Sequence, residues 1–116
     1  MNSQKMRDPF FIAVILYESS CSSKDYRPVY EESFVLISAG SEDEALEKAT
    51  AHAEKQQVSY QNDRGETIIW SLKQVVDVSS CLSDELSDGS EIYVRHFRNY
   101  VAYRSFETLL SGEEEE

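Results

Sequence analysis

The apolar residues of this chain are spaced as in several strands and one helix. Residues 10–17, Phe-Phe-Ile-Ala-Val-Ile-Leu-Tyr, are apolar without alternation, which is typical of a strand covered on both faces or paired centrally in a sheet. Residues 29–39 predict a second strand, in which neighbours such as Phe34 and Val35 face opposite sides. The polar residues 19–28 between these segments predict a mobile loop.

A helix is predicted for residues 41–56. Ser41 can cap the free amide of Glu44, while the Glu44 carboxylate reaches back to the amide of Ser41. Small apolar residues recur on one helical face at Ala45, Ala49 and Ala53. Because these side chains are short, we expect the helix axis to approach one face of a sheet closely and to depend on the rest of the fold for stability.

Two further strands are predicted around a turn. Residues 58–61 form a short strand, and Asn-Asp-Arg-Gly at 62–65 is a turn sequence that favours a hairpin. Residues 66–78 then keep period two. Their apolar positions are Ile68, Trp70, Leu72, Val76 and Val78. This pattern places Trp70 in the core.

The last third of the chain predicts one more strand and a short helix. Residues 92–97 have strand composition and are expected to return antiparallel to the Trp70 strand. Apolar residues within 101–110 fit one face of a short C-terminal helix. The fold class expected is therefore α+β: a mostly antiparallel sheet of about four to five strands, with the long helix of residues 41–56 packed on one face.

Length and composition indicate a single domain. A chain of 116 residues with 41% hydrophobic residues can bury one core. We expect the domain to span residues 10–110, with a flexible N-terminus at 1–9 and a disordered acidic tail at 111–116.

The charge of the chain limits its partners. It carries 22 acidic and 11 basic residues, for a formal charge of −11, so it should repel nucleic-acid backbones and anionic membranes. The apolar run at 10–17 is far shorter than the roughly 20 residues needed to span a bilayer. We therefore expect a cytoplasmic protein that does not bind membranes.

Cysteine and histidine spacing predicts no metal site and no cofactor. Cys21 and Cys81 are far apart and lack CxxC spacing, which favours two free thiols but leaves a single disulfide open. His52 and His96 lie on different predicted elements and form no metal-ligand pattern.

The ordered motifs resemble an uncharacterised, mainly bacterial family, domain of unknown function 4288, over residues 11–97. The resemblance is carried by short segments in order. They are Ala-Val-Ile-Leu-Tyr-Glu at 13–18, Val-Tyr-Glu-Glu at 29–32, the helix start at 41–49, Trp70, and Asp-Gly-Ser-Glu-Ile-Tyr at 88–93 followed by Arg95. The resemblance implies the limits of the domain and no particular chemistry.

Five residues are candidates for a ligand-binding site. They are Glu31, Glu32, Trp70, Tyr93 and Arg95. Glu31 and Glu32 are adjacent on a strand and should point to opposite faces, so they cannot act together on one substrate. We expect one of the two to face inward and to pair with Arg95, because a buried carboxylate needs a charged, hydrogen-bonded partner. No catalytic residue is predicted.

Three functions are weighed. The sequence favours a non-enzymatic protein-interaction module, either a homodimer or an adaptor, that pairs through a sheet edge or the aromatic C-terminal stretch. The alternative is a small-ligand-binding protein or an enzyme that uses the five candidate residues around one end of the sheet. Polyanion binding through residues 95–104 is the third, and the acidic charge of the chain opposes it.

Overall fold

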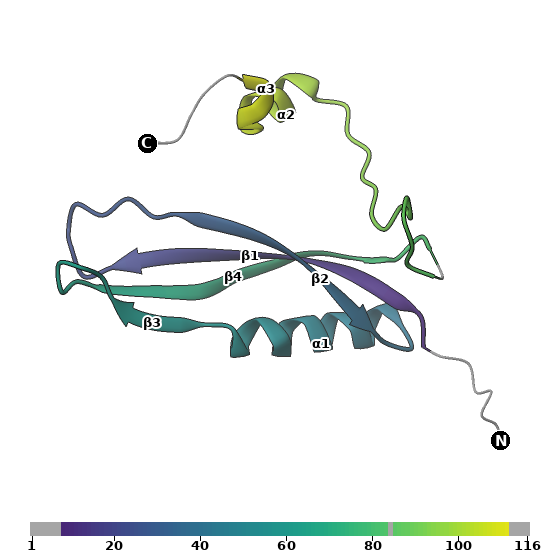
Figure 1. Ribbon diagram of the computed structural model, residues 1–116, viewed down its shortest axis with the longest axis horizontal. Coiled ribbons are helices and arrows are strands. Elements are labelled where there is room, and N and C mark those ends of the chain that lie inside the picture. The colour runs from purple at the N-terminus through teal and green to yellow at the C-terminus, as the bar shows by residue number, and fades with distance from the viewer. Residues whose placement is uncertain (1–7, 84, 112–116) are drawn as a thin grey trace.

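The computed structural model describes residues 8–83 and 85–111. Within these residues the chain forms four strands and three helices (Figure 1). In chain order they are β1 (Phe10–Cys21), β2 (Tyr30–Ser38), α1 (Glu42–Lys55), β3 (Val58–Gln61), β4 (Thr67–Ser80), α2 (Tyr100–Phe106) and α3 (Thr108–Ser111). The predicted flexible residues 1–7 and acidic tail 112–116 lie outside the described residues.

The strands form one antiparallel sheet in the order β2-β1-β4-β3. The apolar run at the start of the chain becomes β1, which is paired on both sides, and Ile12, Val14 and Ile15 are almost fully buried. Since Ile12 and Val14 alternate with Ala13 and Ile15 along the strand, both faces of β1 are covered. The α+β class and the antiparallel sheet are confirmed.

The start of α1 follows the predicted capping pattern with one difference. The Glu44 N–H donates to Ser41 Oγ at 3.1 Å, as expected. The Glu44 carboxylate accepts instead from the N–H of Gly40, at 2.8 Å. Ala45, Ala49 and Ala53 are all fully buried, so the small residues of the stripe are the ones that contact other parts of the fold.

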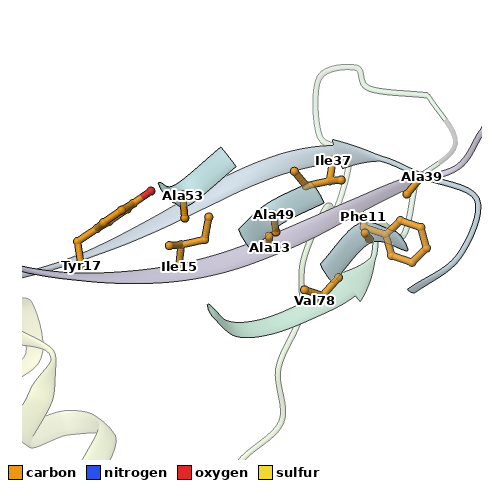
Figure 2. Close-up of a cluster of buried hydrophobic side chains, with 10 residues drawn as sticks. Phe11, Ala13, Ile15, Tyr17, Ile37, Ala39, Ala49, Ala53 and Val78 are labelled. Atoms are coloured by element: carbon orange, nitrogen blue, oxygen red, sulfur yellow. The ribbon is translucent and has the colours of Figure 1, made fainter. Parts of the chain in front are cut away.

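The alanines of α1 share a core with one face of the sheet (Figure 2). The strands supply the large side chains of this cluster. They are Phe11, Ile15 and Tyr17 from β1, Ile37 from β2 and Val78 from β4. Because the helix contributes only methyl groups, its stability depends on the apolar surface that these strand residues present.

Two irregularities in β4 correct the predicted orientation of Val76. The pairing with β1 shifts register between Val14 and Ile15 and again between Leu16 and Tyr17. Each shift adds one residue to β4 and changes which face the following residues occupy. Val75 therefore packs against the core, whereas Val76 is 40% exposed.

The predicted mobile loop is held by a buried serine. Ser19 is fully buried within β1, which runs to Cys21 rather than ending at Tyr17. Its hydroxyl accepts a hydrogen bond from the Val29 N–H at 2.8 Å and also bonds the Tyr26 hydroxyl. The ends of the connection are thereby tied to the sheet.

The predicted strand at 92–97 is wrong. This segment is extended but belongs to no strand. The segment does not join β4, which pairs with β1 along most of its length and with β3 only over Thr67–Trp70. The single predicted C-terminal helix is instead two short ones, α2 and α3, and the described side chains of α2 are all exposed.

The C-terminal residues 82–83 and 85–111, hereafter the arm, follow β4 and add no strand to the sheet. In Figure 1 the arm leaves the end of β4, and α2 and α3 lie on the side of the sheet opposite α1. The chain has a radius of gyration of 18.0 Å, compared with about 13 Å for a compact domain of this length.

A pair of alanine substitutions tests the close packing of α1. Ala49→Leu should lower the free energy of unfolding by about 1–3 kcal/mol, because the added atoms overpack a fully buried position. Ala51→Leu, an exposed position on the same helix, is the matched control and should change stability by less than about 0.5 kcal/mol. Urea denaturation measures both; equal effects would contradict the packing described above.

Candidate functional site

The outer face of the sheet, the face away from α1, holds the first candidate surface. Tyr93 of the arm contacts two strands there. Its ring meets Phe34 edge to face, with centroids 5.5 Å apart, and its hydroxyl donates to Asp77 Oδ2 at 2.8 Å. Val14 of β1 pairs with Phe34 of β2 on one side and with Asp77 of β4 on the other. Tyr93 therefore lies across Val14, which is fully buried.

The Tyr93–Asp77 hydrogen bond shifts the pKa of both groups. The bond from Tyr93 holds the pKa of Asp77 below its usual value, with smaller contributions from Ser79 and Arg95, and partial burial opposes the shift. Burial raises the pKa of Tyr93 first, and its bond to Asp77 raises it further. Both groups keep this bond at neutral pH, where the phenol is protonated and the carboxyl is ionised.

An open groove of about 770 Å³ lies between β2 and the arm. β2 contributes Glu32 and Phe34, and the arm contributes aromatic and basic side chains from residues 93–107. Within the arm, Phe97 and Tyr103 stack with their ring centroids 4.7 Å apart. The groove is therefore walled by aromatic rings on the arm side and by a carboxylate on the strand side.

The expected ion pair of Arg95 with Glu31 or Glu32 does not form. Both glutamates are exposed, so neither is a buried carboxylate that needs a cation. Arg95 is also exposed, and its guanidinium lies 5.9 Å from the centre of the Tyr93 ring, within the range of a cation–π interaction. Among the described residues the ion pair is between Lys73 and Glu18, at 3.3 Å.

The five predicted site residues separate into two groups. Glu32, Tyr93 and Arg95 line the groove on the outer face. Glu31 and Trp70 lie on the α1 side, in a second and smaller cavity. The sequence correctly placed the two glutamates on opposite faces, but the structure does not gather the five residues in one pocket.

The sequence analysis missed several residues of both sites. Phe34 and Asp77 on the outer face were read only as strand positions, although Asp77 is a carboxylate between two valines. Tyr17 and His52 line the smaller cavity. Tyr17 could have been found from the sequence, because it is a tyrosine at the end of an apolar run. A tyrosine in such a place is buried with a hydroxyl group that needs a hydrogen-bond partner.

The two cysteines are free and lie at opposite ends of the β1–β4 ladder. Cys21 pairs with Ile68 at one end, and the Cys81 N–H bonds the Phe10 carbonyl at the other. Phe10 and Cys21 are the two ends of the 12-residue strand β1, eleven steps apart, which is about 36 Å at 3.3 Å per residue. A disulfide between Cys21 and Cys81, left open by the sequence, cannot form in this fold.

Metal and membrane chemistry find no support in the described residues. Over residues 8–83 and 85–111, no three His, Cys, Asp or Glu side chains gather as metal ligands would. No helix in the same ranges is long and apolar enough to cross a membrane.

Comparison with known proteins identifies the family. Residues 10–94 match the family model of the domain of unknown function DUF4288. The match covers well over half of the chain, which therefore belongs to this family, as the motifs of the sequence indicated. No curated protein and no solved structure matches the chain. The family match ends at Val94, so α2 and α3 lie beyond it.

The pH dependence of arm docking can be tested through Asp77. The pKa of Asp77 is lowered in the folded protein, so its contribution to stability is present above the unfolded-state pKa and is lost as the pH falls through the folded-state pKa. Tyr93→Phe removes the main cause of the shift and should raise the pKa of Asp77 toward its usual value, as measured by carbon-13 NMR of the carboxyl group.

Tyr100→Phe is the matched control for this titration. Tyr100 belongs to the same arm but is 57% exposed, so this substitution should leave the pKa of Asp77 unchanged. If Tyr93→Phe also leaves that pKa unchanged, the arm does not dock on Asp77 in solution.

Proposed function

We propose that this protein is a non-enzymatic interaction module that pairs with a second copy of itself, joining the edge of β2 in one copy to residues 92–97 of the other. One observation carries the proposal. Among the described residues, the outer edge of β2 pairs with no strand, and the segment 92–97, which has the composition of a strand, pairs with none either. Exposed edges and extended segments of this kind associate by adding a strand to a sheet.

The free hydrogen-bonding groups of β2 can be assigned. Ser19 N–H donates to the Val29 carbonyl, and Ala39 N–H donates to the Pro9 carbonyl. These two bonds mean that the odd-numbered residues of β2 direct their backbone groups toward β1. The N–H and C=O groups of Glu32, Phe34 and Leu36 therefore point away from the sheet and are available to another strand.

The arm segment supplies matching backbone groups. Ile92–Phe97 is extended, and its backbone makes no hydrogen bond with another described residue. Its sequence, Ile-Tyr-Val-Arg-His-Phe, has the β-branched and aromatic composition of a strand. We expect this segment to pair as a strand only when a second molecule supplies the edge of its β2.

Charge and exposed apolar surface favour the same pairing. The start of β2 carries Glu31 and Glu32, whereas the arm segment carries Arg95 and is followed by Arg98, so an acidic edge faces a basic segment. Apolar side chains stay exposed on both partners. They include Phe34 and Leu36 on β2 and Val94, Phe97, Val101 and Phe106 on the arm. Exposed apolar surface of this extent is typical of an interaction site.

Sedimentation equilibrium of the full chain tests the proposed pairing. The wild-type protein should show a concentration-dependent dimer. Leu36→Lys should weaken dimerisation at least about tenfold, since a lysine on an edge strand disfavours strand addition. Leu36 is 43% exposed, so the monomer should keep its fold.

Val58→Lys is the matched control, because Val58 is 50% exposed on β3, the other edge strand. It should leave the dimer intact. A wild-type chain that stays monomeric at all concentrations would refute self-association, and a larger effect of Val58→Lys would move the interface to β3.

A further inference from the structure

A small cavity lies on the α1 side of the sheet, apart from the groove on the outer face. Its walls come from all four strands and from α1. Tyr17 of β1, Glu31 of β2, His52 of α1 and Trp70 of β4 all line it. Its volume is about 250 Å³, slightly below the range of about 300–1,000 Å³ typical of ligand sites. A cavity of this size accepts a group about as large as one long side chain.

The buried side chain of Tyr17 lines this cavity, and its hydroxyl has no hydrogen-bond partner among the described residues. Tyr17 is 7% exposed. Figure 2 shows the ring running from β1 toward the end of α1 that carries Ala53. A hydroxyl that no protein group occupies can form a hydrogen bond with a bound molecule in place of water.

The carboxylate of Glu31 stands beside this hydroxyl. Glu31 is exposed and has no ion-pair partner among the described residues. Burial raises the pKa of Tyr17, and the negative charge of Glu31 raises it further. The field of the carboxylate therefore reaches the buried hydroxyl, and the same field would attract a positive charge placed between the two groups.

We infer that this cavity binds the positively charged end of an aliphatic amine or guanidine. Glu31 supplies the counter-charge, the Tyr17 hydroxyl accepts a hydrogen bond, and the half-buried Trp70 forms an aromatic wall. The ligand is either a free small molecule or a lysine or arginine side chain from another protein. This site does not depend on the proposed dimer, because it lies on the other face of the sheet.

Trp70 provides a direct signal for binding, since it is the single tryptophan of the chain. The full chain is titrated with agmatine and with its neutral urea analogue, N-carbamoylputrescine, while tryptophan fluorescence is followed. An acetylated and amidated Gly-Arg-Gly peptide and its citrulline analogue form a second pair. The charged member of at least one pair should bind about tenfold or more tightly than the neutral one.

The two pairs distinguish the source of the ligand. Tighter binding of agmatine than of the arginine peptide assigns a free small molecule, and the reverse assigns a protein side chain; either result supports the cation site. Equal binding of the charged and neutral members, or no change in Trp70 fluorescence with any probe, overturns the inference.

Substitutions of the two neighbouring glutamates then test which carboxylate is the counter-ion of the bound cation. Glu31→Gln should weaken binding of the charged probe about tenfold or more, and Glu32→Gln should not, because Glu32 faces the outer groove. If the two variants bind equally well, Glu31 is not the counter-ion.

Tyr17→Phe separates binding from stability. It should weaken binding several-fold while leaving the melting temperature unchanged or raised, since the hydroxyl it removes forms no hydrogen bond with the part of the chain that the structure describes. A clear fall in the melting temperature would show that the hydroxyl serves the fold, and would count against the site.

Discussion

The burial of β1 on both of its faces is the constraint on which the rest of the structure depends. The strand is paired on both sides and carries Ile12, Val14 and Ile15 with almost no exposure. Burying each such side chain contributes about 1.5–3 kcal/mol. The side chains of β1 point to both faces of the sheet, so each face must be covered by another part of the chain. The helix α1 covers one face, and the arm covers part of the other.

α1 and the arm cover the two faces of the sheet to different extents, and this difference determines which apolar surface stays exposed. α1 lies close because its alanines are small, and strand residues fill the space beneath it. The arm covers β1 mainly through Tyr93, which spans from Phe34 to Asp77 over Val14. One tyrosine cannot cover a whole sheet face, so Phe34 and Leu36 stay exposed beside the free edge of β2. The incomplete cover leaves the surface that our proposed dimer would use.

Alternation along β2 divides the acidic pair between two surfaces. Glu32 enters the groove beside the arm, whereas Glu31 enters the cavity beside Trp70. Neighbours on a strand point to opposite faces, so adjacent residues of one type come to serve different partners. In our proposals Glu32 faces a basic protein segment and Glu31 faces the positively charged end of a bound amine or guanidine.

Local patterns along the sequence determined the α+β class, the bounds of the helix, the strand at the start of the chain and the opposite facing of Glu31 and Glu32. These features depend on short-range periodicity and capping, which the order of residues contains directly. The tertiary structure alone decided the rest. The bulges of β4 turned Val76 outward, the Ser19 hydroxyl tied its loop to the sheet, and residues 92–97 joined no strand. Tyr17, Glu31 and Trp70 met in one cavity for the same reason: each outcome depends on which strands become neighbours, and strand pairing joins residues whose separation in the chain carries no periodic signal.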